Sequence, residues 1–184
     1  LALTNSLLFN ALIEEGVYII LNIGAHKTNM VIYGSKAKFF ARDLAWGGYF
    51  LTKDIMKREK MSFAEAEKYK FENGISKRSQ VKSSANGGLS TLEISDKPTE
   101  EQIALEVKRS LRYYVKEAGN SDFRKVLLVG GSAKLKGLPE YLQEQLNIPT
   151  EVFNPFVSLE LPEKLKDKRD PQLAMAIGLA MRPD

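Results

Sequence analysis

Residues 20–29 read ILNIGAHKTN, and residues 127–137 read LLVGGSAKLKG. In each stretch, a run of apolar residues with the length of a strand leads directly into glycine. Apolar runs rich in Val, Ile and Leu are typical of strands that are covered on both faces. A glycine after such a strand permits a tight turn whose backbone N–H groups can approach a ligand closely. Each turn alone is also compatible with plain packing.

The first turn, residues 24–29, offers two side chains suited to phosphate: Lys27 supplies a charge and Thr28 supplies a hydroxyl donor. The second turn, Gly130 and Gly131, leads into a helix, at the strand end where open α/β sheets bind ligands. Neither stretch matches the P-loop or the dinucleotide-binding fingerprint. The residues alone therefore leave packing and ligand binding open.

The composition is that of an ordinary globular protein, with 184 residues, of which 43% are hydrophobic and 27% charged. This length allows one domain, or one domain with a smaller insertion. The lack of cysteine excludes disulfides and thiolate metal sites, and a single histidine, His26, argues against a zinc site. We expect no resident metal site and a reducing, cytoplasmic compartment.

The formal net charge of +4 is spread along the chain, and acidic residues interrupt even the basic run 164–169. Because basic and aromatic residues do not alternate as a stacking groove requires, we expect no nucleic acid binding. No stretch approaches the roughly 20 apolar residues of a membrane span, so we expect no direct membrane insertion. The chain begins inside an apolar helix without a Met, which favours a piece of a longer protein.

Periodicity and capping signals predict an α/β order of elements. Ser62 with Glu65, and Thr99 with Gln102, have the spacing of capping boxes that begin helices. Residues 74–98 are polar and lack a period, so we expect a mobile surface excursion, and residues 164–169 are expected to be exposed. The predicted strands are 17–23, 28–34, 36–45 with a turn at Gly34-Ser35, and 125–129, and residues 150–156 are predicted to be a short strand or an extended segment. The predicted helices are 1–13, 49–60, 62–71, 99–118, 138–146 and 171–181.

This layout resembles one lobe of the actin, Hsp70 and sugar kinase fold, an RNase H-like mixed sheet with flanking helices and a smaller inserted subdomain. More closely, the chain resembles the PilM family of type IV pilus assembly proteins, relatives of the cell division protein FtsA. The resemblance spans most of the chain except residues 74–98, and residues 126–156 are its most specific part. It rests on NIGAHKTNMVIYG (22–34), FFARDLAWGGYFLTKDI (39–55), MSFAEAEKYK (61–70), VLLVGGSAKLKGLPEYLQEQLNIPTEVFNPF (126–156) and PQLAMAIGLAMR (171–182).

The resemblance implies that residues 1–48 and 98–184 form the second large nucleotide-binding subdomain, with a smaller subdomain inserted at residues 49–97. It implies ATP with Mg²⁺ as cofactor, the first turn holding the β and γ phosphates and the second holding adenosine. The other large subdomain would precede Leu1, so we expect weak or absent binding by this chain alone. The implied cofactor-binding residues are Asn22, Gly24, Ala25, Lys27, Thr28, Asn29, Gly130, Gly131 and Ser132.

One position departs from the family pattern, because Asn22 stands where the family has an Asp that helps to hold Mg²⁺ through water. An amide accepts a hydrogen bond but lacks the negative charge that favours a hard cation. We therefore expect nucleotide binding without efficient hydrolysis. No catalytic residue is assigned, since Glu14, Glu15 and Asp43 have no evident partner for acid–base work.

The resemblance implies an ATP-binding adaptor of type IV pilus assembly, cytoplasmic and peripheral at the inner membrane through its partners. The implied partners are the cytoplasmic tail of a PilN-like membrane protein, other pilus assembly proteins and the missing lobe, with self-association also possible. Two alternatives remain open: an active ATPase or sugar kinase on the same fold, and an FtsA-like filament former in division. His26 is expected to be exposed on its turn, and Trp46 to pack between the subdomains rather than bind a ligand.

Overall fold

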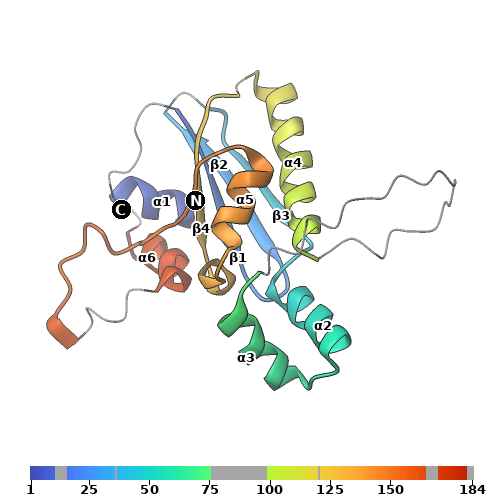
Figure 1. Ribbon diagram of the computed structural model, residues 1–184. Helices are drawn as coiled ribbons and strands as arrows, with labels where there is room; N and C mark the ends of the chain where they lie inside the picture. The colour runs from blue at the N-terminus through green and yellow to red at the C-terminus, as the bar shows by residue number, and fades with distance from the viewer. Residues whose placement is uncertain (11–15, 36, 76–98, 120, 165–169, 182–184) are drawn as a thin grey trace, which may run out of the picture.

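The computed structural model describes residues 1–10, 16–35, 37–75, 99–119, 121–164 and 170–181, and shows a five-stranded sheet with helices on both faces (Figure 1). The strand order is β3-β2-β1-β4-β5, with β1 in the centre. The strands are β1 Val17–Ile23, β2 Thr28–Gly34, β3 Phe40–Leu44, β4 Phe123–Val129 and β5 Thr150–Val152.

The sheet combines an antiparallel meander with parallel strands. Strands β1, β2 and β3 pair antiparallel, as the sequence predicts, whereas β4 pairs parallel to β1 and to β5. Because β1 and β4 are parallel neighbours, Asn22 pairs with Val129 and both strands end at the same edge of the sheet. This arrangement brings the two glycine turns together.

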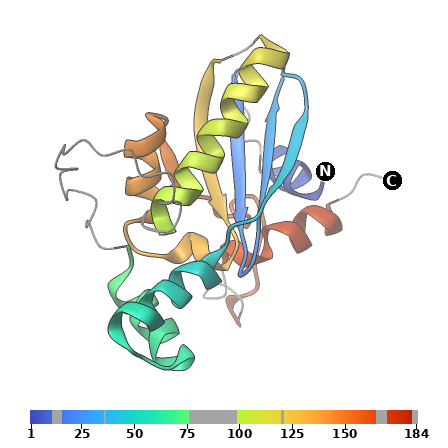
Figure 2. The same ribbon diagram turned by 90° about the vertical axis from the view of Figure 1, so that its right-hand side faces the viewer.

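Two hydrophobic layers cover the sheet, as Figures 1 and 2 show from two directions. Alternate residues of β1 face opposite ways: Ile19 and Leu21 join the cluster under α4 and α5, and Tyr18 and Ile20 join the cluster under α1 and α6. Both faces of β1 are therefore buried, which confirms the prediction of a central strand. The covering helices are α1 Ala2–Phe9, α4 Thr99–Ala118, α5 Leu138–Leu146 and α6 Ala174–Ala180.

Helices α1 and α6 lie close together because Gly178 of α6 has no side chain. A Cβ atom at Gly178 would collide with the backbone carbonyl of Ala2. The expected close packing at Gly178 is therefore present, and it is made by α1. Residues 11–15 lie outside the described residues, so the second half of the helix predicted over 1–13 is not described.

Helices α2, Gly48–Glu59, and α3, Phe63–Asn73, pack against each other beyond the edge where β1 and β4 end (Figure 1). The predicted capping box is confirmed, because the Ser62 side chain accepts from the backbone of Glu65 while the Glu65 carboxylate accepts from the backbone of Ser62. Residues 76–98 and 165–169, predicted to be a mobile excursion and an exposed run, lie outside the described residues.

The third strand is shorter than predicted. It begins at Phe40 rather than at residue 36, and Phe40 pairs with Ile32. The connection from β2 is therefore longer than a tight turn at Gly34-Ser35, although Ala37 does donate a backbone hydrogen bond to Gly34, at 3.2 Å. The residues before Phe40 resemble a strand in sequence although they are not paired in the sheet. Ala37, for example, packs against the main hydrophobic cluster.

Candidate functional site

The two glycine turns are in direct contact at the carboxyl ends of β1 and β4. Gly130 has φ +88°, and a Cβ atom there would lie 2.6 Å from the carbonyl oxygen of Ile23 and 2.7 Å from the side-chain oxygen of Asn22. Only glycine combines this left-handed backbone with so little space. The second turn is thus pressed against the strand end that carries the first.

Ser132 links the turns a second time. Its hydroxyl is buried and donates to the carbonyl of Gly24 at 3.4 Å. A Cβ at Gly48, the first residue of α2, would collide with the same hydroxyl. Ser132 therefore lies where β1, β4 and α2 meet.

The first turn presents backbone donors to the surface. Gly24 donates to the carbonyl of Lys27 at 3.0 Å, which closes the turn, while Ala25, His26 and Lys27 are exposed. The backbone N–H groups of Ala25 and His26 meet no acceptor among the described residues. Free backbone N–H groups on a turn, beside a lysine, are among the elements of an anion-binding nest.

The Thr28 hydroxyl forms a hydrogen bond within the protein. The side chain is fully buried, and its hydroxyl donates to the carbonyl of Trp46 at 2.9 Å. In this structure the group fixes the segment before α2 to the start of β2, and the expected hydroxyl contact to phosphate stays a prediction.

Three polar side chains form a row across the meander. Asn22 donates to the side-chain oxygen of Asn29 at 3.1 Å, and Asn29 donates to the Asp43 carboxylate at 2.6 Å. The Lys27 ammonium lies 3.7 Å from the same carboxylate. The strand register makes this row, because Asn22 pairs with Asn29 and Asn29 with Asp43. Sequence reasoning left Asp43 without a partner, because the register of the third strand was not known.

The first turn is bonded directly to the start of α2. Gly48 donates to the carbonyl of Gly24 at 2.9 Å and Tyr49 donates to the carbonyl of Ala25 at 2.7 Å. The His26 ring stacks on the Tyr49 ring, with centroids 4.9 Å apart. The first turn and the start of α2 are therefore in direct contact.

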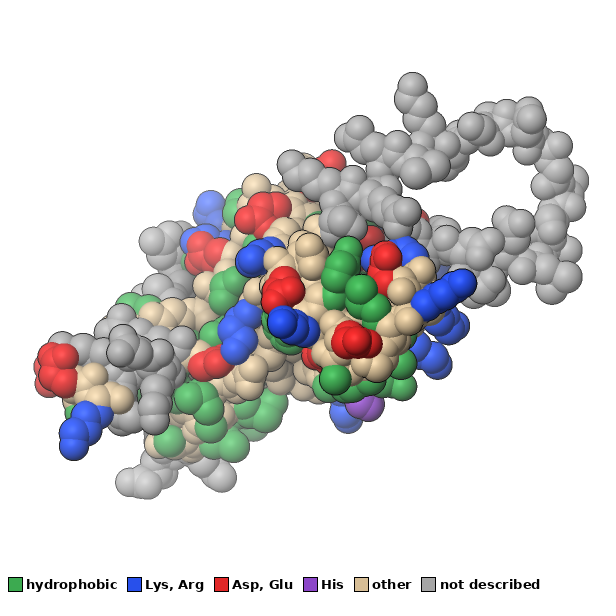
Figure 3. All heavy atoms as spheres, turned by 60° about the horizontal axis from the view of Figure 1, so that its bottom comes forward, with side chains coloured by type: hydrophobic (Ala, Val, Ile, Leu, Met, Phe, Trp, Pro, Cys, Tyr) green, Lys and Arg blue, Asp and Glu red, His purple; other side chains and the backbone are tan. Residues whose placement is uncertain are grey.

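Exposed apolar side chains gather around the single histidine, which Figure 3 shows in purple at the rim of the molecule. Tyr49, Phe50 and Phe63 are each more than a third exposed, and their rings contact one another through Tyr49. This exposed aromatic group contacts the first turn through the stacking of Tyr49 on His26.

A buried lysine lies between α3 and the start of α2, and sequence reasoning missed it. Lys70 is 4% exposed, and its ammonium donates to Glu67 at 2.6 Å, to the Thr52 hydroxyl at 2.8 Å and to the Gly48 carbonyl at 3.2 Å. Burial raises the pKa of the Glu67 carboxyl, but hydrogen bonds from Lys70 and Thr52 outweigh it, so the pKa lies below its ordinary value. A buried charge is retained only where it is fully paired. The i,i+3 spacing of Glu67 and Lys70 was the available signal.

The second turn is held from the other side by the segment before α6. Gly130 donates to the carbonyl of Pro171 at 3.1 Å, and the side-chain nitrogen of Gln172 would lie 3.1 Å from a Cβ at Gly131. Lys134 pairs with Asp170 at 2.7 Å, and this hydrogen bond holds the pKa of Asp170 below its ordinary value. Gln172 thus covers the glycine pair, another contact that sequence reasoning did not find.

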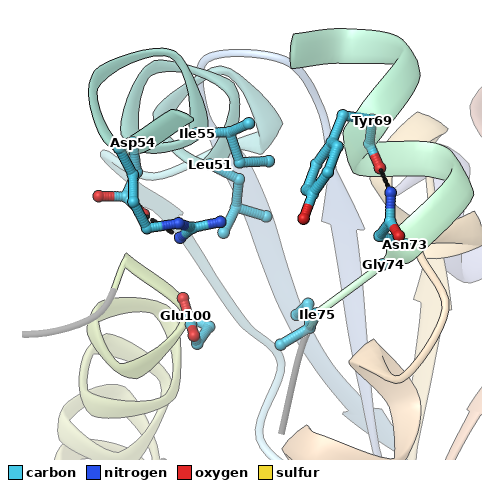
Figure 4. A pocket seen from close by; sticks show the side chains of 9 residues that line it. Leu51, Asp54, Ile55, Tyr69, Asn73, Gly74, Ile75 and Glu100 are labelled. Atoms are coloured by element: carbon cyan, nitrogen blue, oxygen red, sulfur yellow. Dashed lines mark hydrogen bonds and ion pairs between the residues drawn. The ribbon is translucent and has the colours of Figure 1, made fainter. Parts of the chain in front are cut away.

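A small pocket lies between α2, α3 and the start of α4 (Figure 4). It holds about 40 Å³, room for a water molecule rather than a nucleoside. Arg58 crosses its wall and pairs with Asp54 at 3.2 Å. None of the predicted site residues lines it, so it is separate from the two turns. Its lining residues are Leu51, Asp54, Ile55, Arg58, Tyr69, Asn73, Gly74, Ile75 and Glu100.

Two absences apply to the described part of the chain. It holds no group of three His, Cys, Asp or Glu side chains placed to bind a metal ion. Within the same residues, no helix combines the length and the apolar character that a membrane crossing needs.

Comparisons with known proteins identify the family and the fold. The sequence model of the family described as type IV pilus assembly protein PilM matches residues 1–184. The fold is similar to a chain of a PilM-PilN type IV pilus biogenesis complex, with a TM-score of 0.74 and 24% identity over 99% of this chain and 51% of that one.

Two further solved structures share the fold. The ethanolamine utilization protein EutJ from Carboxydothermus hydrogenoformans has a TM-score of 0.62 and 22% identity over 97% of this chain and 53% of that chain. An archaeal actin homolog in complex with ADP has a TM-score of 0.54 and 17% identity over 96% and 53%. The chain thus spans about half the length of the structures it matches. At these identities they establish the fold: one lobe of the actin-like type, as the sequence predicts.

Proposed function

The chain belongs to the family of the type IV pilus assembly protein PilM, and on that premise we propose that it is the nucleotide-holding lobe of an ATP-dependent adaptor in pilus assembly. The observation that carries the proposal is the contact between the two glycine turns, made by Gly130 against Asn22 and by Ser132 against Gly24. An actin homolog of similar fold is known in complex with ADP, which supports a nucleotide as the ligand.

The residues present fit ATP in chemical terms. The free N–H groups of Ala25 and His26, with the Lys27 ammonium nearby, suit the β and γ phosphates. Gly130, Gly131 and Ser132 would lie beside the adenosine, where the lack of side chains at the glycines allows close approach. A bound ATP would supply the negatively charged phosphates, and the chain would supply the N–H groups and the ammonium that bind them.

Hydrolysis is disfavoured by the polar row of Asn22, Asn29 and Asp43. The strand end that would face Mg²⁺ carries an amide, and the nearest carboxylate in the row, Asp43, is already paired with Lys27 and Asn29. A neutral ligand at this position attracts a hard cation less than a carboxylate does. We therefore expect the whole protein to bind ATP through its backbone donors, with weaker support for Mg²⁺ than a carboxylate would give, and to hydrolyse ATP slowly.

We extend the proposal to the partner and to the place of action. The solved PilM-PilN complex supports a PilN-like tail as the partner of the whole protein. This chain spans about half of the chain that it matches in that complex. Binding such a tail would hold the protein at the cytoplasmic face of the inner membrane. The two lobes would then couple ATP occupancy to the arrangement of the pilus machine.

The test is calorimetric titration of Mg-ATP into the chain and into the full-length protein that contains it, together with phosphate release. We expect binding to require both lobes and hydrolysis to be slow. Replacing Asn22 with Asp should strengthen Mg²⁺-dependent binding or speed hydrolysis, whereas the matched change Asn147→Asp, at the exposed end of α5, should do neither.

Other outcomes would overturn the proposal. Rapid turnover with Asn22 intact would favour an active ATPase or kinase. ATP-dependent pelleting in sedimentation would favour a filament former. Absence of binding by every version would leave a scaffold that does not use nucleotide.

A further inference from the structure

A shallow apolar groove of about 610 Å³ lies between α4 and α5, beside the start of β4. Strand β4 has seven residues and the two turns follow its other end, so the groove lies roughly 20 Å from the candidate nucleotide site. Figure 2 shows the C-terminal half of α4 at the end of the sheet opposite α2 and α3. The lining residues are Leu105, Lys108, Leu111, Arg112, Val115, Phe123, Leu146 and Ile148.

Helix α4 has a second apolar face beside its core face. Its core face carries Ile103, Val107 and Tyr114, all buried against the sheet. Leu105 and Val115 lie on the adjacent stripe, which faces the groove and is only partly covered. A helix that serves only as a lid on the sheet needs one such stripe. The described fold covers this second stripe only in part, and Lys108 and Arg112 interrupt its apolar residues.

The groove carries positive charge and no carboxylate. Lys108 and Arg112 are its only ionisable lining residues, one turn apart on α4. Lys108 donates to the neutral side chain of Gln145 at 3.3 Å, and Arg112 is exposed. Within the described residues neither of these two cations forms an ion pair with a carboxylate. A partner with an apolar face edged by carboxylates would cover the apolar lining of the groove and pair with its two cations.

We propose that this groove binds an acidic amphipathic helix of another protein. The stripe from Leu105 to Val115 advances by roughly 15 Å, which matches about three turns of a helix laid along α4. Apolar side chains of the partner at helical spacing fill the groove, and its flanking carboxylates pair with Lys108 and Arg112. The surface is thus a protein interaction site independent of nucleotide.

Helix α3 exposes Phe63 and Phe71, but its three glutamates already pair with Ser62, Lys68 and Lys70, so it does not fit this description. Helix α1, ALTNSLLF, and helix α6, AMAIGLA, contain no acidic residue. A second copy docking through either helix would leave Lys108 and Arg112 unpaired next to apolar surface. Charge complementarity therefore favours a different, acidic protein over self-association.

The first test uses two designed helical peptides of about 14 residues with the same leucine stripe, one flanked by Glu and the other by Lys. Fluorescence anisotropy with the purified protein should show binding of the Glu peptide at least tenfold tighter than binding of the Lys peptide. The variant Lys108→Glu/Arg112→Glu should reverse this preference. Lys116→Glu, the same charge change on an exposed part of α4 outside the groove, should preserve it.

Charge reversal separates binding from folding, because the double variant must gain affinity for the Lys peptide. The proposal is overturned if both peptides bind equally, if neither binds, or if Lys116→Glu has the same effect as the double variant. A concentration-dependent dimer that Val115→Glu abolishes would also overturn it, since the occupant would then be a second copy.

The second test is photo-cross-linking in cells from a reactive side chain at position 115 of the full-length protein. Cross-linked peptides should come from an acidic segment with apolar residues at helical spacing. Segments without that pattern, or segments of this chain, would contradict the proposal.

Discussion

Replacing Gly130 with Ala should separate the two glycine turns and destabilise the protein. The backbone of Gly130 has φ +88° and ψ 174°, a region that is open only to glycine. Forcing another residue there costs about 1–3 kcal/mol. The new Cβ would also lie 2.6 Å from the Ile23 carbonyl oxygen and 2.7 Å from the Asn22 side chain, and such overpacking costs a further ~1–3 kcal/mol. We expect a total loss of roughly 2–6 kcal/mol.

Gly119→Ala is the matched control, because Gly119 has φ +65° but open space around its Cβ position. It should cost only about 1–2 kcal/mol, the backbone contribution alone. Urea unfolding of both variants, with the slope of the transition checked, measures the difference. Amide hydrogen exchange should accelerate at residues 24–27 only in Gly130→Ala. Equal losses of stability for the two variants would refute the inference that the turns are pressed together.

The other predictions concern the helices beside the turns. Lys70→Met keeps the apolar stem but leaves Glu67 without its ion pair, so we expect a loss of about 2 kcal/mol in urea unfolding, against none for the exposed Lys68→Met. The pKa of Glu67 is lowered in the folded state, so its ionised carboxylate stabilises the fold above the ordinary pKa, and this stabilisation is lost as pH falls through the folded pKa. The free energy of unfolding should therefore drop below about pH 5, and it should drop less in Lys70→Met. Gly178→Ala should force α6 away from the carbonyl of Ala2 and lower the melting temperature, and an unchanged value would contradict the close approach.

The sequence was most informative where local chemistry decides the structure. The bounds of β1 and β2 follow from apolar runs between glycines, and the Ser62 capping box follows from two residues three apart. Gly130 was recognisable as a turn residue because few other residues tolerate that position. These features depend on neighbours in the chain, so no tertiary information was needed.

The missed features depend on pairing between distant segments. Asp43 joins the polar row only through the register of β3, and Lys70 is buried only because α3 packs on the start of α2. A lysine in a charged helix indicates an exposed face, and nothing local in the sequence contradicts that interpretation. The bond of the Thr28 hydroxyl was missed for the same reason, since its acceptor belongs to Trp46, 18 residues away.

Trp46 gives the protein a built-in optical reporter, because it is the single tryptophan of the chain. Its ring is 2% exposed, and its indole nitrogen donates to the carbonyl of Thr99 at 2.9 Å, so it joins the segment before α2 to the first residue of α4. Emission from a dry indole is blue-shifted and moves to the red when water enters. A swing of α2 and α3 relative to the sheet would therefore register as a change in intrinsic fluorescence, with no label attached.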